Sequence, residues 1–530
     1  MSSPPWWQRG TVYQVYPRSF ADGDGDGVGD LRGLRTHLDH LSALHVQAVW
    51  LSPVFPSPMA DFGYDVADYC DVDPLFGTLD ELDGLIADCH GRGIRVLLDW
   101  VPNHSSDRHP WFLASRSSRA DPRRDWYVWR DGAPDGGPPN DWRSEFAAVG
   151  PAWTHDEATG QWYLHSYTPQ QPDLNWENPD VEAAMYDVVR FWFDRGVDGL
   201  RVDALQRLGK DPLLRANAGS DRRHDQDWEP VAHERLRRIR RVADEYPDRV
   251  LVGEVYLLDQ RRVVDYLAGG DQLHMAHNFV FLHLPWDAAA FRRVVEEFED
   301  LAEPDAWPAW FLGNHDHSRI ATRYDDGRGS GPARARAAAL LLTALRGTPF
   351  LYQGDELGLP DAEIPPDRVV DVDGRDPERA PLPWRPPSVA GPGAGFTTGT
   401  PWLPLVRDAE ELCAERQAAD PASTLSLVRR LGALRAGSET LQSGDQRFLD
   451  AGPDVLAWLR TGGSGRLLAA VNLASGPRGL QLRGLPDAEA SVLLSTDPAA
   501  GAPGRVSLSE LVLRPDEAVL LQLAGTAQDS

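Results

Sequence analysis

Short apolar segments that favour β-strands alternate with longer amphipathic segments through most of this 530-residue chain. Strands that alternate with helices in this way indicate βα units and a parallel sheet. Eight strands are predicted, at residues 11–17, 47–53, 95–101, 198–204, 249–255, 276–282, 309–314 and 349–353. Helices are predicted at residues 31–44, 79–92, 181–194, 231–245, 288–301, 333–345 and 425–436. The pattern predicts an α/β fold, a (β/α)₈ barrel.

Two regions depart from this alternation. Residues 103–172 are rich in Trp, Pro, Gly and Asp, which predicts a subdomain inserted after the third strand. Residues 441–530 contain short apolar runs between Gly, Pro and Asp turns, which predicts a C-terminal antiparallel β-sandwich domain. The barrel would then comprise residues 1–102 and 173–440. The Pro-rich segment 354–404 is either a functional βα loop or disordered.

The charge of the chain excludes one class of partner. There are 80 acidic residues against 53 basic ones, a net charge of −27. Nucleic-acid binding without sequence preference needs clustered positive charge, so no nucleic-acid partner is expected. The three cysteines lack metal-binding spacing, and no apolar run is long enough for a membrane span or a signal peptide. We expect a cytoplasmic protein with no membrane partner; the oligomeric state stays open.

Acidic residues lie where the predicted strands end. Asp99, Asp203 and Glu254 end the third, fourth and fifth strands, and Asp316 follows the seventh. Barrel enzymes carry their catalytic groups at the carboxyl ends of the strands. Two carboxylates about 5–5.5 Å apart are the equipment of a retaining glycosidase. Arg201 and Asp203 would point to the same face of one strand, although a lone Arg-x-Asp pair is more often an ordinary ion pair.

A glycine-rich acidic loop follows the first strand. Asp22, Asp24, Asp26 and Asp30, with the backbone carbonyl of Val28, stand at the oxygen-donor positions of the first part of a calcium loop. Gly33 occupies the twelfth position, where an EF-hand has Glu, so only a similar cation-wrapping turn is expected. The plainer alternative is a solvated acidic loop. We favour a bound Ca²⁺ or Mg²⁺, which would relieve the mutual repulsion of four carboxylates.

Several motifs together resemble those of one known family. They are Asp-Trp-Val-Pro-Asn-His at 99–104, Gln-Pro-Asp-Leu-Asn-Trp at 171–176, Gly-Leu-Arg-Val-Asp at 199–203, Gly-Glu-Val at 253–255, Asn-His-Asp at 314–316, Gly-Arg-Asp at 374–376 and Arg-Ala-Pro-Leu-Pro-Trp at 379–384. In combination they resemble the alpha-amylase family, glycoside hydrolase family 13, in its alpha-glucosidase and oligo-1,6-glucosidase branch. The resemblance covers nearly the whole chain.

The resemblance implies a role for each matching residue. Asp203 would be the nucleophile, Glu254 the acid/base, and Asp316 would grip hydroxyls of the bound glucose. Arg201 would orient Asp203, and Asp99 would act as a support. The implied substrate-binding residues are Asp61, Tyr64, His104, Tyr167, Gln171, Arg201, His315 and Arg375. The implied metal is structural, on Asp22, Asp24, Asp26, the Val28 carbonyl and Asp30.

The implied function is that of a retaining, exo-acting alpha-glucosidase on short oligosaccharides. A glucosyl transferase or a sucrose or maltose isomerase would use the same intermediate and remains an alternative. A third alternative is a non-catalytic relative, but such proteins lack the complete carboxylate set and carry a membrane segment. Position 204 is often Val in 1,6-cleaving and Thr in 1,4-cleaving relatives. It is Ala204 here, which leaves the linkage open.

Overall fold

The computed structural model describes residues 4–483, 485, 489–499 and 504–524. Its central sheet has eight strands, in the order β10-β11-β1-β2-β3-β7-β8-β9. All neighbours in this sheet pair in parallel, and a further parallel bridge from His277 to Ala309 joins its two ends. The predicted (β/α)₈ barrel is therefore confirmed. The strands are β1 Val12–Val15, β2 Ala48–Leu51, β3 Arg95–Trp100, β7 Gly199–Val202, β8 Val250–Gly253, β9 Met275–Ala276, β10 Ala309–Trp310 and β11 Thr348–Tyr352.

Helix α6, Pro179–Asp194, lies on the outside of the barrel and buries one apolar face. In α6, buried Val181, Met185, Val188 and Trp192 recur at helical spacing. The α-helices in the barrel part of the chain are α1 Trp6–Arg9, α2 Leu31–Thr36, α3 Leu38–Ala43, α4 Leu79–Gly91, α6 Pro179–Asp194, α7 Val231–Ala243, α8 Gln260–Asp265, α9 Phe279–Leu282, α10 Ala288–Leu301, α11 Ile320–Arg323, α12 Gly331–Ala344, α13 Pro387–Ala390, α14 Ala409–Leu412, α15 Ala414–Ala419, α16 Thr424–Ala436 and α17 Glu439–Ser443.

Alternation along the strands separates the two faces of the barrel wall. Leu97 of β3 lies in a core inside the barrel, whereas Val96 and Leu98 pack in the core beneath the helices. Asp99 follows Leu97 on the inner face, and its register partner on β7 is Arg201. This register brings a carboxylate and a guanidinium together at the carboxyl end of the barrel.

Three predicted elements were wrong in detail, among them the strand predicted over 309–314, which ends at Trp310. The helix predicted over 31–44 is two helices, α2 and α3, separated at His37. The Thr36 hydroxyl and the His37 ring both bond to the carbonyl of Gly33, at 2.7 and 2.9 Å, which competes with the helical backbone bond. The strand predicted over 276–282 ends at Ala276. Asn278 then caps α9 by accepting from the backbone N–H of Phe281.

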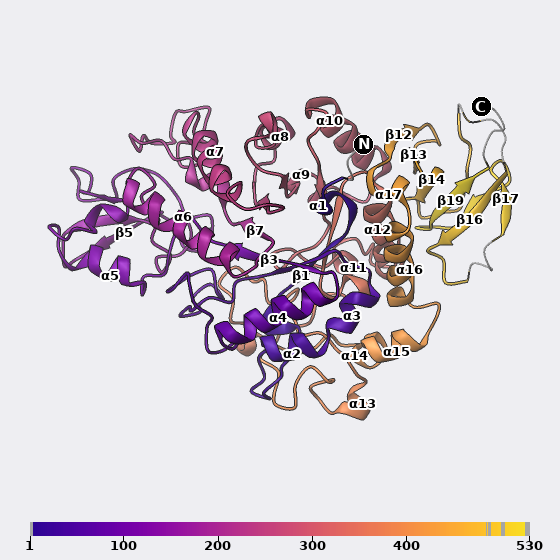
Figure 1. Cartoon of the computed structure of the whole chain (residues 1–530), viewed down its shortest axis with the longest axis horizontal. Helices are drawn as coiled ribbons and strands as arrows, with labels where there is room; N and C mark the ends of the chain where they lie inside the picture. The colour runs from indigo at the N-terminus through magenta and orange to yellow at the C-terminus, as the bar shows by residue number, and fades with distance from the viewer. Residues whose placement is uncertain (1–3, 484, 486–488, 500–503, 525–530) are drawn as a thin grey trace.

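The insertion and the C-terminal region flank the barrel at opposite ends of the molecule (Figure 1). The insertion contains α5 Pro110–Ser117 and an antiparallel sheet of β4 Trp129–Arg130, β6 Gln161–Leu164 and β5 Trp153–Asp156. The C-terminal region has a six-stranded and a two-stranded antiparallel sheet. Their strands are β12 Asp445–Leu449, β13 Val455–Gly462, β14 Gly465–Asn472, β15 Arg478–Gly479, β16 Glu489–Ser495, β17 Arg505–Ser507, β18 Val512–Leu513 and β19 Ala518–Leu523.

The domain limit predicted at 440/441 falls inside helix α17. The domain limits remain predictions from the sequence. The Pro-rich segment 354–404 packs against the barrel, and it buries the charged side chains of Asp371, Arg375 and Arg379. Within the described part of the chain, no helix is both long enough and apolar enough to cross a membrane.

Candidate active site

A buried arginine lies at the centre of the carboxyl end of the barrel. Arg201 Nη1 lies 2.7 Å from Asp99 Oδ1 and 2.7 Å from Asp203 Oδ1. Its Nη2 lies 3.1 Å from Glu254 Oε2. The side chain of Arg201 is 1% exposed, so the guanidinium is solvated by these three carboxyls rather than by water. The Trp50 ring covers it, with its centroid 5.0 Å from Cζ.

The strand register fixes the relation between Asp203 and Glu254. Val202 and Gly253 are partners on β7 and β8, so the next residues leave the sheet side by side. The backbone N–H of Ala204 donates to Glu254 Oε2 at 2.8 Å, which ties the two strand ends together. Ala204 adopts a left-handed backbone conformation, with φ of 46°, and so turns the chain directly after Asp203.

Burial and mutual repulsion set the protonation of these carboxyls. Burial, and next the charge of Glu254, raise the pKa of Asp203, whereas Arg201 lowers it. Burial also raises the pKa of Asp99 to about 6, against the opposing effect of Arg201. One guanidinium cannot fully compensate three carboxylates, so the group retains a proton as such coupled pairs do. The retained proton belongs to the group of carboxyls as a whole.

A second group of ion pairs closes one wall of the cavity. Arg375 bridges Asp61 Oδ1 at 2.6 Å and Asp316 Oδ1 at 3.0 Å. Arg379 also reaches Asp316, at 2.9 Å. Burial alone would raise the pKa of Asp316, but His315, Arg375 and Arg379 hold it well below its usual value. Asp316 is therefore a permanent anion.

Neutral hydrogen-bonding groups complete this wall. Gln171 Nε2 lies 3.0 Å from Asp61 Oδ2 and 3.1 Å from His104 Nε2. Burial lowers the pKa of His104 to about 4, so the ring is uncharged at neutral pH. The Tyr64 hydroxyl donates to Asp99 Oδ2 at 3.0 Å, and the Tyr167 ring lies 5.2 Å from the His104 ring.

The single lysine of the chain joins the barrel to the insertion behind His104. Lys210 Nζ donates to Asn103 Oδ1 at 2.6 Å and to the Arg207 carbonyl at 2.6 Å. It also lies 2.9 Å from Asp173 Oδ2. Because the ammonium takes the oxygen of Asn103, the amide nitrogen faces His104 Nδ1, at 3.1 Å. The ring proton of His104 is thereby directed to Nε2, which lies 3.1 Å from the Tyr64 carbonyl oxygen.

Most of the predicted site residues line one cavity of about 230 Å³. Among the predicted catalytic and substrate-binding residues, Arg201 and His315 are the exceptions, and the His315 ring is stacked on that of Tyr64 at 5.4 Å. The predicted residues that line it are Asp61, Tyr64, His104, Tyr167, Gln171, Asp203, Glu254, Asp316 and Arg375. Lining residues that the sequence analysis missed are Glu145, Phe146, Gln206, Tyr256, Phe279, His317 and Asp373.

Some of the missed residues carried a sequence signal. Gln206 and Tyr256 follow the predicted carboxylates by two or three positions, and His317 is next to Asp316. Residues shortly after a barrel strand end lie in the loops that form the site, so these could have been named. Glu145 and Phe146 lie inside the irregular insertion, where no local pattern distinguishes them.

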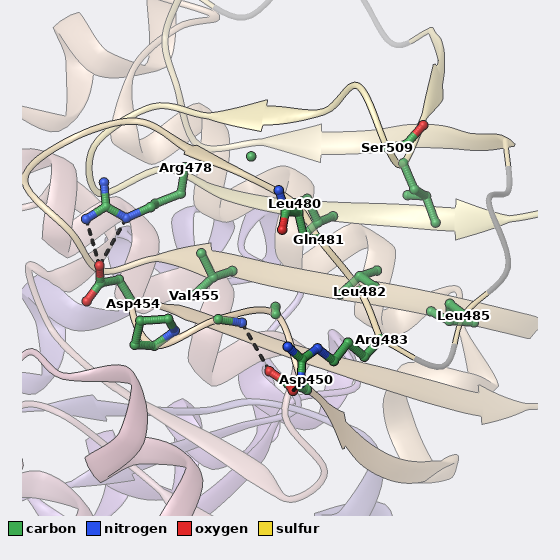
Figure 2. Close-up of a pocket in the computed structure, with 15 residues that line it drawn as sticks. Asp450, Asp454, Val455, Arg478, Leu480, Gln481, Leu482, Arg483, Leu485 and Ser509 are labelled. Carbon is green, nitrogen blue, oxygen red and sulfur yellow. Dashed lines mark hydrogen bonds and ion pairs between the residues drawn. The ribbon is translucent and has the colours of Figure 1, made fainter.

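A larger cavity, of about 760 Å³, lies against the C-terminal sheets (Figure 2). The charged side chains there are already paired, with Arg478 Nη2 2.7 Å from Asp454 Oδ2 and Arg483 3.5 Å from Asp450. All four side chains are between 43% and 87% exposed. Exposed ion pairs of this kind are ordinary surface chemistry, so size alone does not make this cavity the reactive site.

The acidic loop brings three of its four aspartates together. Carboxylate oxygens of Asp22, Asp24 and Asp30 lie within 4.8 Å of one another, while Asp26 stands outside this group. Among the described residues, none of these aspartates has a basic side chain within ion-pair distance. Asp30 also caps α2 by accepting from the backbone N–H of Gly33. Clustered carboxylates without a counter-charge fit a hard cation.

Known proteins share this fold and these motifs. The family model of the alpha-amylase catalytic domain matches residues 14–444. A probable alpha-glucosidase of Rhizobium meliloti is 41% identical, over 88% of this chain and 89% of that protein. A trehalose-6-phosphate hydrolase of Escherichia coli is 37% identical, over 89% and 91%. The crystal structure of an alpha-glucosyl transfer enzyme is 38% identical with a TM-score of 0.86, over 98% of this chain and 99% of that one.

The barrel, its carboxyl-end carboxylates and these matches define a glycoside hydrolase. This chain belongs to the alpha-amylase family. The branch is that of the alpha-glucosidases, as the sequence motifs had indicated.

Proposed function

We propose that this chain is a retaining, exo-acting alpha-glucosidase that releases glucose from the non-reducing end of short alpha-glucosides. One observation carries the proposal: Arg201 holds Asp203 and Glu254 together beneath a small cavity. Ion pairs of Arg375 with Asp61 and Asp316 close one wall of this cavity. A closed wall favours a terminal sugar unit over the middle of a long chain.

In the first half of the reaction, a carboxylate oxygen of Asp203 attacks the anomeric carbon of glucose. The glycosidic carbon–oxygen bond breaks, and Glu254 gives its proton to the leaving oxygen. The Arg201 guanidinium stabilises the carboxylate form of Asp203 until the bond forms. Asp316, a permanent anion, would accept hydrogen bonds from glucose hydroxyls and favour the positive charge that develops on the sugar ring.

In the second half, Glu254 is ionised and takes a proton from water. The water oxygen attacks the anomeric carbon, the bond to Asp203 breaks, and alpha-glucose leaves with its configuration retained. If a sugar hydroxyl replaces water, the same step is glucosyl transfer. The alternative function of a transferase or isomerase therefore needs no other residue, and the similarity to an alpha-glucosyl transfer enzyme favours keeping it.

Product analysis tests this proposal. Maltose, isomaltose and sucrose are incubated separately with the purified enzyme, and the products are separated by chromatography. Free glucose, released first as the alpha anomer by proton NMR, is the expected result. New disaccharides with little glucose would support the transfer alternative. Glucose released first as the beta anomer would contradict the retaining mechanism.

We also propose a structural Ca²⁺ or Mg²⁺ on the acidic loop and a cytoplasmic location. Asp22, Asp24 and Asp30 would hold the cation, with Asp26 and the Val28 carbonyl as further candidate ligands. The cation would offset part of the negative charge of the loop and take no part in the reaction. The three cysteines are unpaired thiols, which suits a reducing compartment. Fractionation of source cells followed by an activity assay tests the location.

A further inference from the structure

The relatives leave one question open that the charges of the site can answer. Relatives of similar identity include an alpha-glucosidase and a hydrolase named for a phosphorylated disaccharide. These substrates differ in charge on the part of the molecule that leaves. We propose that the leaving-group side of this cavity accepts uncharged hydroxylated groups and rejects anionic ones, phosphorylated sugars included. This inference rests on the proposed function.

The leaving-group side is identified by the proton donor. Glu254 protonates the leaving oxygen, so the leaving group lies beside the residues that follow Glu254 and Asp203. Tyr256 lies there, with its ring 4.6 Å from that of Phe279 and 6.4 Å from that of His317. Gln206 is held by the Tyr256 backbone N–H, which donates to its Oε1 at 3.3 Å. These four side chains all line the cavity.

The charges that line the cavity are almost all negative. Six lining residues are acidic, and Arg375 is the one basic residue among those described. The two lining histidines do not change this balance, because burial lowers the pKa values of His104 and His317 to about 4. The acidic lining residues are Asp61, Glu145, Asp203, Glu254, Asp316 and Asp373.

Cations behind the lining do not reverse this sign. Arg201 faces three carboxyls, Asp99, Asp203 and Glu254. On the other wall, Arg375 and Arg379 together also face three, Asp61, Asp316 and Asp371. Around Arg201, one retained proton leaves two carboxylates against one guanidinium. On the other wall, three carboxylates stand against two guanidinium groups. Each group therefore carries one excess negative charge.

Two guanidinium groups beside Gln206 and Glu145 are already matched. Arg207, buried beside Gln206, pairs with Glu145 and with Asp225 at 2.7 Å. Arg223 pairs with the same Asp225 at 2.6 Å. Two guanidinium groups thus face two carboxylates, and neither is free to bind a phosphate.

Asp373 adds a negative charge that has no ion-pair partner among the described residues. Its side chain has no ion-pair or hydrogen-bond partner among the described residues, and it is exposed at the edge of the cavity. Burial and the neighbouring charges of Asp371, Asp316 and Asp61 raise its pKa, against the effect of Arg375. An anionic group that reaches this edge of the cavity would be repelled by Asp373 and by these neighbouring carboxylates.

Hydrogen-bonding capacity points the same way. Asn314 Oδ1 accepts from the Asp316 backbone N–H at 3.0 Å and lies 2.9 Å from His317 Nδ1. His317 Nδ1 is therefore the protonated nitrogen, and its Nε2 is an acceptor. Acceptors at His317 and Asp373 suit the hydroxyl donors of a neutral sugar. A phosphate dianion offers only acceptors and would leave them unpaired.

The test compares two aryl alpha-glucosides, 4-nitrophenyl alpha-glucoside and its 3-carboxylate analogue. We measure kcat/KM for wild type, Asp373→Asn and Asp373→Lys, at low salt and at 0.5 M NaCl. Asp373 has no side-chain partner to lose, so both variants should fold. Asp367→Asn is the matched control, because Asp367 is exposed in the same segment and does not line the cavity.

Wild type should prefer the neutral glucoside by about tenfold or more at low salt, and salt should narrow the preference because it screens exposed charge. Asp373→Asn should raise kcat/KM for the carboxylate about threefold and Asp373→Lys about tenfold, relative to the neutral glucoside. The control should keep the wild-type ratio. A wild-type ratio near one, or the same ratio in all variants, would overturn the inference.

A second arm uses trehalose 6-phosphate beside maltose, isomaltose and trehalose. Faster turnover of the phosphorylated sugar than of every neutral disaccharide would also overturn the inference. If no neutral glucoside is cleaved or transferred, the proposed function itself has failed. That outcome is distinct from turnover of neutral and anionic glucosides at equal rates.

Discussion

Two regions of the molecule bury arginine side chains and compensate their charge in opposite ways. At the carboxyl end of the barrel, Arg201 is surrounded by the carboxyls of Asp99, Asp203 and Glu254. Between the barrel and the C-terminal sheets, Arg435 and Arg460 are equally buried but contact carbonyl oxygens only, among the described residues.

The carbonyls that accept from Arg435 and Arg460 lie at the ends of two helices, α12 and α17, and directly after them. Arg435 donates to the Thr343 carbonyl at 2.8 Å, and Arg460 to the Ala344 carbonyl at 2.7 Å. Both arginines also reach the Leu441 carbonyl. The last carbonyls of a helix lack backbone partners and carry partial negative charge, so they favour a cation.

The type of partner distinguishes a region that can do chemistry from a region that supports the structure. Carboxyls around Arg201 can gain or lose a proton and can attack a substrate, so charge compensation there is adjustable. Carbonyls do neither, so the contacts of Arg435 and Arg460 fix the joint between two parts of the chain. Burial lowers the pKa values of both arginines to about 9, the cost of placing a cation among neutral dipoles.

The largest expected effect falls on the carboxyl-rich region. Asp203→Ala should reduce kcat by about 10⁴-fold or more, because the covalent intermediate cannot form. The midpoint of thermal unfolding should stay near the wild-type value or rise, since one repelling carboxyl is removed. Steady-state kinetics and calorimetry measure the two. Glu254→Gln is the companion variant, and near-normal activity in either would refute the assigned roles.

A substitution between the barrel and the C-terminal sheets should instead lower stability and leave activity nearly unchanged. Arg460→Met should lower the free energy of unfolding by about 2–3 kcal/mol, because the Gly444 carbonyl loses its hydrogen bond in a buried place. The kcat at 25 °C should stay within about twofold of wild type. Urea unfolding followed by tryptophan fluorescence measures the loss. Arg466, partly buried on the same sheet, gives the matched control Arg466→Met, which should be nearly neutral.

A pH series sharpens the comparison at a third buried charge, Glu378, whose pKa burial raises to about 8. The unfolded pKa is lower, about 4.3, so the folded protein holds the proton more strongly and wild type loses stability as pH rises from 5 to 8. Glu378→Gln has no proton to lose. The unfolding free energy of Glu378→Gln relative to wild type should therefore increase with pH, by up to about 1.4 kcal/mol per unit. A constant difference would contradict the raised pKa.

The smallest effect concerns the acidic loop, where the carboxylates of Asp22 and Asp30 accept backbone N–H groups but pair with no basic side chain among the described residues. Removal of divalent cations with EDTA should lower the unfolding temperature by about 2 °C, and added Ca²⁺ should restore it. Asp24→Asn should make the unfolding temperature insensitive to both treatments. An EDTA-insensitive wild type would argue for a solvated loop without metal.

The strands and the carboxylates at their ends could be predicted because both follow local rules. Alternation of apolar residues gave the barrel, and the predicted helix 288–301 coincides with α10. The motifs predicted that Asp203, Glu254 and Asp316 lie together at the carboxyl end of the barrel. The break at His37 was missed because it depends on two side chains competing for one carbonyl. Such a contact has no periodic signature.

Contacts between residues far apart in the chain could not be predicted from the sequence. Arg460 meets Ala344, 116 residues away, and nothing near either residue marks the contact. Glu145 reaches the cavity from an irregular insertion, and Asp373 from a long Pro-rich segment. Their positions follow from packing across the whole molecule, which no window of a single chain contains.

The single lysine has a practical consequence for handling this protein. Lys210 lies under the insertion with its ammonium group bonded to Asn103 and Asp173, so no lysine amine stands on the surface. Dyes, cross-linkers and resins that react with lysine amines should leave the folded side chains unmodified. Trypsin can cut the folded protein only after arginine, because Lys210 is buried. Appearance of a labelled lysine would therefore report that the insertion has come away from the barrel.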